Sequence, residues 1–282
     1  MIGWTKSMNK KWISVLCVLP FFILAAATVS ANEGEHSCGT IPCDEFKPNL
    51  HDNASMQRGA KTFVNYCMGC HALGFMRYQR MGNDLDIPDN IVQQNLNFAG
   101  GNIGDLMSIA APVKAQKKWF GVAPPDLTLV SRVRGPEWLY TYLRNFYRDD
   151  TRPYGVNNRV FKDVAMPNVL LELQGVAECA PGPVHAANGG VRRDPLTGAD
   201  ILFDPKTGVA LNPCGLLHVP KPGKLDPAQF DATIADLVNF LAYAGEPAAL
   251  KRQSMGVYAL LFILLFFILA WLLNREYWKD VH

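Results

Sequence analysis

The stretch Cys67-Met68-Gly69-Cys70-His71 decides how the rest of the chain is interpreted. It has the form C-x-x-C-H, the pattern through which a c-type haem is attached covalently. In this pattern the two cysteine thiols add to the two vinyl groups of the haem, and the histidine that comes next binds the iron as its proximal ligand. The stretch therefore predicts one covalent haem c held by Cys67, Cys70 and His71.

Two other interpretations of the paired cysteines are a zinc site and a redox-active dithiol. A structural zinc site needs a second pair of ligands at similar spacing, and the sequence contains none. A thioredoxin-like motif has no use for the adjacent histidine and is typical of a βαβ unit. Covalent haem attachment is therefore favoured, and an export signal at the N-terminus supports it.

Residues 1–31 have the parts of a secretory signal peptide. Three lysines precede an almost wholly apolar run over residues 12–27, and Val29-Ser30-Ala31 resembles an A-x-A cleavage site. A retained N-terminal anchor is the alternative, but the apolar run is short and is interrupted by a proline. We therefore expect cleavage and a mature chain that starts near Asn32.

Residues 255–273 contain no charged side chain and predict a membrane-spanning helix. At about 1.5 Å per residue, a helix of this length just crosses a hydrocarbon core of about 30 Å. Basic residues flank the run equally on both sides, so the orientation is taken from the export signal instead. We expect a single-pass protein of the inner membrane, with a periplasmic haem domain over residues 32–254 and a cytoplasmic tail over residues 274–282.

The charge balance limits the remaining function classes. The chain carries 27 Lys+Arg and 25 Asp+Glu, and no basic stripe predicts nucleic-acid binding. Neither a Ser/His/Asp arrangement nor a paired-carboxylate site is evident, so the sequence predicts no independent catalytic residues.

Four cysteines remain outside the signal peptide and the haem motif, namely Cys38, Cys43, Cys179 and Cys214. In an oxidising compartment they are expected to pair, and four cysteines allow three pairings. We favour Cys38 with Cys43, which would close a small loop, and Cys179 with Cys214, which bracket a segment rich in glycine and proline.

Hydrophobic periodicity predicts a single, mostly α-helical haem domain. One helix is expected to begin at Asn53 or Ser55 as N-cap and to run into Cys67, and another spans residues 136–147. A third begins with Asp226 as N-cap and Pro227 as first residue, and it ends at Gly245-Glu246-Pro247. The apolar stripes of the last two comprise Trp138, Leu139, Tyr142, Leu143 and Phe146, and Phe230, Ile234, Leu237, Val238 and Leu241.

Weaker signals describe the segments between these helices. A loop is expected over residues 82–90, and a helix is possible over residues 90–96. Residues 115–119 are predicted to be weakly helical. Residues 121–128 are predicted to be extended, and Asp126 is a candidate cap for the element that follows them. Residues 175–225 predict a small β excursion, because Asp194-Pro195-Leu196-Thr197-Gly198 recurs as Asp204-Pro205-Lys206-Thr207-Gly208, and each is a turn signal. Short strands are expected beside these turns, over residues 199–203 and 209–211.

A haem iron bound by one histidine needs a second axial ligand or keeps an open site. Met166 is preferred, because its irregular loop lies far enough downstream of His71 for the chain to wrap the haem. Pro167 restricts the backbone beside it. His185, His218 and Met107 are the alternatives.

With these residues identified, the chain resembles the cytochrome c1 family, the membrane-anchored haem subunits of cytochrome bc1 complexes. The motifs that carry the resemblance are Met56-Gln57-Arg58-Gly59, Cys67-Met68-Gly69-Cys70-His71, Ala123-Pro124-Pro125-Asp126-Leu127-Thr128, Arg132-Val133-Arg134, Ala165-Met166-Pro167, and Lys251-Arg252 before the anchor. The resemblance implies ligation of iron by His71 and Met166. It also implies that Arg134 lies near a haem propionate and that a carbonyl of Pro124–Pro125, which we assign to Pro125, accepts the ring N–H of His71.

The function that the resemblance implies is one-electron transfer within quinol–cytochrome c reductase. The electron donor would be a Rieske iron–sulfur protein, the acceptor a soluble or tethered c-type cytochrome, and the other partner cytochrome b, in a dimeric complex in the membrane lipid. Two alternatives remain. One is a haem subunit of a terminal oxidase or nitric-oxide reductase, and the other is a haem-based gas sensor with an open sixth site.

Overall fold

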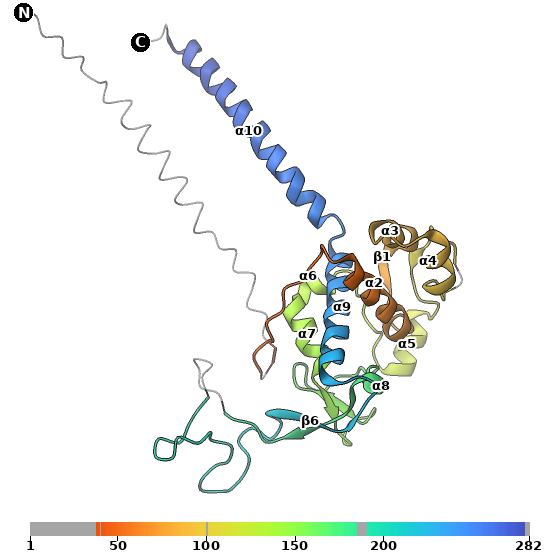
Figure 1. The fold of residues 1–282 in the computed structure, drawn as a ribbon, viewed down its shortest axis with the longest axis vertical. Coiled ribbons are helices and arrows are strands. Elements are labelled where there is room, and N and C mark those ends of the chain that lie inside the picture. Colours follow the sequence, from red (N-terminus) through yellow and green to blue (C-terminus); the bar gives the residue numbers. More distant parts are fainter. Residues whose placement is uncertain (1–37, 40, 100, 185–190, 280–282) are drawn as a thin grey trace, which may run out of the picture. The chain divides into compact units, whose positions relative to one another are not determined.

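The computed structural model describes residues 38–39, 41–99, 101–184 and 191–279. The predicted signal peptide, the alternative ligand His185 and the end of the predicted tail lie outside the described residues. The elements in chain order are α2 (Asn53–Thr62), the π-helix η1 (Phe63–Cys67), β1 (Leu73–Arg77), α3 (Tyr78–Asp84), α4 (Asp89–Asn95), β2 (Leu106–Met107), α5 (Val113–Phe120), α6 (Val130–Arg134), α7 (Pro136–Arg144), β3 (Phe146–Arg148), β4 (Val156–Asn158), α8 (Leu171–Gln174), β5 (Gly175–Ala180), β6 (Leu216–Pro222), α9 (Pro227–Gly245) and α10 (Ala249–Tyr277) (Figure 1).

The predicted fold class is confirmed, because helices dominate and the strands form two-stranded antiparallel sheets. The sheets pair β1 with β2, β3 with β4, and β5 with β6. Each pair is too small to fold independently, so the strands depend on the helices on which they rest.

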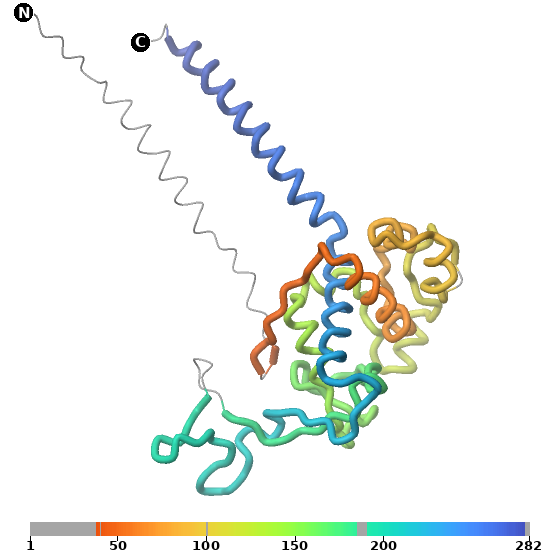
Figure 2. The backbone as a smooth tube through the Cα atoms, in the orientation of Figure 1, coloured from red at the N-terminus to blue at the C-terminus, as the bar shows by residue number. Residues whose placement is uncertain are grey.

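The centre of the core is the contact between α2 and α9, which lie side by side although they are far apart in the sequence (Figure 2). The predicted stripe of α9 is confirmed, since Phe230, Ile234, Leu237, Val238 and Leu241 are all buried. The two helices approach most closely at Gly59, where a Cβ atom would lie 2.1 Å from the carbonyl oxygen of Asp236. Only glycine allows this backbone approach, which gives Gly59 a structural role.

Both helices of this pair are capped by aspartates. Asp226 caps α9 as predicted, and it forms a capping box in which Gln229 returns a hydrogen bond to the Asp226 backbone. The prediction for α2 is wrong by one residue, because Asp52 is the N-cap and accepts a hydrogen bond of 2.9 Å from the Ser55 amide. The carboxylate of Asp52 reaches the amide three residues on, which places Asn53 inside the first turn.

Further corrections concern the segments around the haem motif. The loop predicted over residues 82–90 is partly wrong, since α3 extends to Asp84 before the chain turns. The possible helix over residues 90–96 is confirmed as α4, and the weak helix at 115–119 is confirmed as α5. Residues 121–128 form no helix or strand, in agreement with the predicted extended segment.

The helix predicted over residues 136–147 ends earlier, at Arg144. Phe146 to Arg148 instead form strand β3, which pairs with β4 through Phe146 opposite Asn158. Asn158 also donates a hydrogen bond of 2.9 Å from its side-chain amide to the carbonyl of Tyr142, so it bonds one of the last carbonyls of α7. This long-range pairing therefore replaces the last turn of the predicted helix.

The β excursion is confirmed, but its strands lie at its two ends. β5 and β6 pair in antiparallel fashion, and the predicted disulfide between Cys179 and Cys214 joins this region. The strands predicted over residues 199–203 and 209–211 are reduced to single bridges, which link Arg193 with Asp200 and Phe203 with Ala210. Both predicted turns form, because the carboxylates of Asp194 and Asp204 each accept hydrogen bonds from the amides two and three residues further along.

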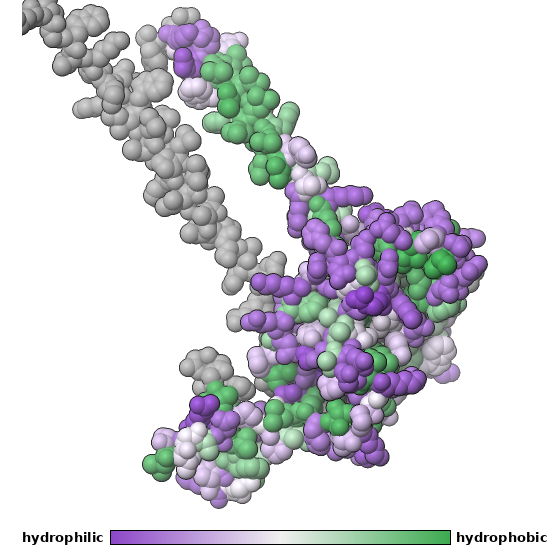
Figure 3. Space-filling view, viewed as in Figure 1, coloured by the Kyte–Doolittle hydropathy of each residue, from purple (hydrophilic) through white to green (hydrophobic). Residues whose placement is uncertain are grey.

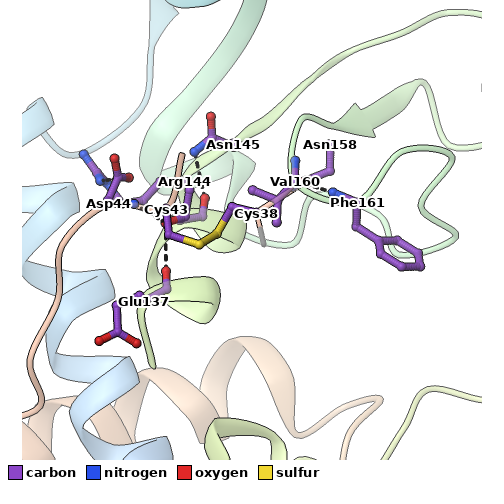
Figure 4. The surroundings of a disulfide bond; sticks show 10 residues. Cys38, Cys43, Asp44, Glu137, Arg144, Asn145, Asn158, Val160 and Phe161 are labelled. Atoms are coloured by element: carbon purple, nitrogen blue, oxygen red, sulfur yellow. Dashed lines mark hydrogen bonds and ion pairs between the residues drawn. A yellow bond between two sulfur atoms is a disulfide. The ribbon is translucent and has the colours of Figure 1, made fainter. Parts of the chain in front are cut away.

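The second predicted disulfide, Cys38–Cys43, is also confirmed and lies between α7 and the loop that carries Val160 (Figure 4). Within the bridged loop, Gly39 has a φ of +71°, and a Cβ atom there would lie 2.5 Å from the carbonyl oxygen of Val160. Beyond the bridge, the Asp44 amide donates a hydrogen bond of 2.8 Å to the Thr141 hydroxyl on α7.

The C-terminal helix α10 contains the predicted membrane span and extends beyond it at both ends. It has 29 residues, and its most apolar stretch of 18 residues has a mean hydropathy of 2.7, with none of that stretch buried against the rest of the described chain. Figure 3 shows continuous apolar surface along its middle. A helix that is apolar on every face suits lipid, so α10 has the properties of a single membrane anchor.

Candidate functional site

The attachment loop begins where η1 ends. Cys67 and Cys70 carry free thiols, whereas the other four cysteines in the described part of the chain form the two disulfides. The amides of Cys70 and His71 both donate hydrogen bonds to the Cys67 carbonyl, at 3.1 and 2.9 Å. Burial raises the pKa of the Cys67 thiol to about 12, so this thiol is protonated at neutral pH.

Met68 fixes the middle of the attachment loop. Its side chain is buried, and its sulfur lies 3.5 Å from the hydroxyl oxygen of Tyr78, which donates to it from α3. Gly69, in contrast, has no atom within 4 Å of the position that a Cβ would take. One side of the loop is therefore anchored in the core and the other side is open.

His71 is held by the loop that contains Pro125. The Nδ1 atom of His71 lies 2.7 Å from the carbonyl oxygen of Pro125, the contact that the family resemblance implies. Burial lowers the pKa of His71, while the Pro125 carbonyl and the charge of Asp126 oppose that shift. A neutral imidazole that donates from Nδ1 leaves Nε2 with a free lone pair, which is the state needed to bind a metal.

The segment from Pro125 to Thr128 is tied to the chain just beyond the motif. The Leu127 amide donates to the Ala72 carbonyl at 2.9 Å, and Asp126 accepts a hydrogen bond of 2.6 Å from the Gly74 amide. The expectation that Asp126 caps the next helix is wrong, because its carboxylate bonds β1 and the Thr128 amide instead. Asp126 therefore ties the segment that carries the Pro125 carbonyl to the strand that follows His71.

Met166 is partly buried and packs against the hydrophobic core. Its sulfur lies 3.5 Å from the hydroxyl oxygen of Tyr142, a buried residue of α7. Burial raises the pKa of Tyr142, so its phenol stays protonated and donates the hydrogen bond. Met166 is therefore fixed by a specific polar contact and not only by packing.

Two of the alternative ligands are engaged elsewhere. Met107 is fully buried in β2, where it pairs with Leu73. His218 lies on β6 of the excursion and is half exposed, with its Nε2 atom 3.9 Å from a carboxylate oxygen of Glu178. Neither environment offers a reason to prefer these residues over Met166.

Arg134 lies on the surface at the end of α6, and its guanidinium carbon is 5.1 Å from the centre of the Trp138 ring. Trp138 in turn stacks on Tyr142, with ring centres 4.7 Å apart. Aromatic contacts therefore connect Arg134 to the residue that holds Met166. The propionate partner of Arg134 stays a prediction.

Sequence reasoning missed the two tyrosine hydroxyls and the role of Asp126. The sequence places Tyr142 only in an apolar stripe, and it does not single out Tyr78. The available signal was chemical: a buried tyrosine needs a partner for its hydroxyl, and methionine sulfur is the acceptor that both of these tyrosines find.

The residues present fit a covalent haem c. Two free thiols, an imidazole with a free Nε2 and a thioether make up the donor set of a haem with histidine and methionine ligands. Large apolar side chains are exposed on β1, just after the motif, and on the segments around Pro125 and Arg134, namely Phe75, Val122, Leu129 and Val133.

The chain is similar to known proteins over most of its length. The model of the Cytochrome C1 family matches residues 46–179 and 225–281. A cytochrome c1 of Allochromatium vinosum is 45% identical over 267 residues, which cover 94% of this chain and 98% of the relative. A protein of Nitrosomonas europaea named ammonia monooxygenase gamma subunit is 37% identical and covers 93% of this chain and 98% of its own length. A cytochrome c1 of Rhodobacter capsulatus is 22% identical over a stretch that covers 81% of this chain and 84% of the relative. The chain belongs to the cytochrome c1 family.

Proposed function

We propose that this chain is the membrane-anchored haem subunit of a quinol–cytochrome c reductase, which passes single electrons from a Rieske iron–sulfur protein to a c-type cytochrome. The observation that carries the proposal is the pair of free thiols beside an imidazole whose Nδ1 atom is bonded to a backbone carbonyl. Family membership supplies the context of a cytochrome bc1 complex, which implies covalent haem c and electron transport.

Each residue of the site has a defined part in holding the cofactor. Cys67 and Cys70 would form the covalent links, and His71 and Met166 would be the ligands of the iron. The Pro125 carbonyl keeps the His71 ring in one orientation and one tautomer, and Arg134 pairs with a propionate. When bound, haem c supplies a one-electron centre whose potential is raised by a thioether ligand.

The chain contributes binding, orientation and redox tuning and no acid–base step. Quinol oxidation then belongs to the partner subunits, cytochrome b and the Rieske protein.

We further propose that the chain is cleaved after residue 31 and assembles in a dimeric complex. The haem domain would lie on the periplasmic side of the inner membrane, and residues 274–282 on the cytoplasmic side. The apolar surface of α10 supports the membrane part of this proposal.

Purification from native membranes in mild detergent tests the assignment. We expect the chain to co-purify with a di-haem cytochrome b and a Rieske protein, and the complex to reduce a c-type cytochrome with quinol. Co-purification with subunits of a terminal oxidase or a nitric-oxide reductase would contradict the assignment. Co-purification with an ammonia monooxygenase, the enzyme in the name of the Nitrosomonas relative, would also contradict it. Binding of carbon monoxide by the native reduced protein would favour a gas sensor instead.

A further inference from the structure

One face of α7 carries a continuous row of aromatic rings. Trp138 and Tyr142 are stacked at 4.7 Å with an interplanar angle of 11°, and Tyr142 meets Phe146 edge-on at 5.2 Å. Trp138 and Tyr142 are four residues apart, which places them on one face of the helix, and Phe146 continues the row just beyond its end. The Tyr142 ring is therefore clamped between two others and has little freedom to rotate.

The clamped ring presents its hydroxyl to one acceptor. The Tyr142 oxygen lies 3.5 Å from the sulfur of Met166, and the residue is 9% exposed. A buried hydroxyl is costly unless it is hydrogen-bonded, so this contact holds both side chains in place. A thioether sulfur has two lone pairs, and one remains available when the other accepts this bond.

We propose that Tyr142 is a positioning residue that directs the sulfur of Met166 and raises the potential of the haem. This inference rests on the proposed function, because it requires Met166 to be an iron ligand. A sulfur that accepts a hydrogen bond donates less electron density to iron, and this favours the reduced state. Hydrogen bonds to ligand atoms are one of the means by which a protein sets a haem potential.

The chain supplies a matched control in Tyr78. Its hydroxyl also lies 3.5 Å from a methionine sulfur, but that sulfur belongs to Met68 in the attachment loop, which is not a candidate ligand. Tyr78 is buried, as Tyr142 is, so Phe at either position removes one hydroxyl from a buried ring. The two variants differ in whether the sulfur that loses its partner is proposed to bind iron.

The test is a redox titration of the purified complex with Tyr142→Phe and with Tyr78→Phe. We expect Tyr142→Phe to keep covalent haem and to shift the midpoint potential downward, with a change in the ferric methionine-to-iron charge-transfer absorption. Tyr78→Phe should shift the potential less than Tyr142→Phe does, because the sulfur that loses its partner, that of Met68, is not proposed to bind iron. An unchanged potential in Tyr142→Phe, or an equal shift in both variants, would overturn the inference.

A second substitution covers the case in which Tyr142→Phe does not assemble. Site-specific fluorotyrosine at position 142 preserves the ring and makes the hydroxyl a stronger donor, so we expect the potential to shift upward. No shift, or a downward shift, would overturn the inference. Met166→Leu separates this result from the proposed function: if it alters the potential while the changes at position 142 do not, Met166 remains the ligand and only the role of Tyr142 fails.

Discussion

The helical part of the chain and the β excursion over residues 175–225 are held together in different ways. The helices bury their apolar faces against each other, as α9 does against α2. The excursion exposes apolar side chains such as Leu196, which is 94% exposed, and relies on a disulfide and on local turns. The family match divides the chain at nearly the same places, since it covers residues 46–179 and 225–281 and leaves out residues 180–224, most of the excursion.

This difference shows where the site depends on the fold. The proposed haem-binding residues, Cys67, Cys70, His71, Pro125, Arg134 and Met166, all lie in the helical part. The excursion leaves and re-enters that part through β5 and β6. Arg159 links the two regions, because its guanidinium bonds the Gly215 carbonyl at 2.7 Å and the Asn145 side chain at 3.0 Å. Changes in the helical part should therefore reach the haem, and changes in the excursion should stay local.

Gly59→Ala should have the largest effect, because it forces α2 and α9 apart. The added methyl would lie 2.1 Å from a backbone oxygen, which no side-chain rotation relieves. We expect a loss of about 3 kcal/mol or more in the free energy of unfolding, measured by denaturant titration of the detergent-solubilised protein. Gly104→Ala is the control, since no atom lies within 4 Å there, and it should change stability by about 0.5 kcal/mol at most. Equal stability of the two variants would contradict the account of the α2–α9 contact.

Replacement of both Cys179 and Cys214 by alanine should have an effect that is confined to the excursion and leaves the helical part intact. The bridge spans a sequence separation of 35 residues, and for such a loop the chain-entropy model gives a stabilisation of the folded state of about 3–4 kcal/mol. We expect limited proteolysis to cut between residues 180 and 215 while the haem spectrum stays unchanged. A parallel loss of haem would show that the excursion belongs to the haem fold.

Acid should loosen the first turn of the excursion, which begins at Asp194, and this is the smallest of the three expected effects. The amides of Thr197 and Leu196 lower the pKa of Asp194 by donating to its carboxylate. A depressed pKa in the folded state means that the turn is stabilised above the unfolded pKa and loses that stabilisation as the pH falls through the folded pKa. The two amide chemical shifts should therefore titrate with a midpoint below the ordinary value of about 3.9, and they should not titrate in Asp194→Asn. A midpoint at or above that value would contradict the assigned hydrogen bonds.

Local signals explain which parts of the fold were predictable from the sequence. The capping of α9 by Asp226 and the two disulfides depend on residues close in sequence or on composition. The haem motif and the anchor are continuous stretches, so they too could be recognised directly. The exact cap of α2 could not be chosen, because Asp52, Asn53 and Ser55 are all suitable residue types.

Long-range contacts explain the failures. Helix α7 ends early because β4 pairs with the chain immediately after it, and Asp126 is diverted to an amide 52 residues away in sequence. Inside the excursion only single bridges form, and its main strand pairing joins β5 with β6, at its two ends. The contact of Tyr142 with Met166 is of the same kind, since no periodic pattern specifies which buried acceptor a tyrosine will find.

The central claim is that His71 and Met166 bind a covalently attached haem, and a redox titration of Met166→Leu tests it most directly. Leucine has a similar volume, so packing is nearly kept while the iron loses its sulfur ligand. The account predicts that covalent haem is retained, that the midpoint potential falls and that the ferrous protein binds carbon monoxide, whereas Met107→Leu changes none of these. An unchanged potential together with no binding of carbon monoxide in Met166→Leu would contradict it.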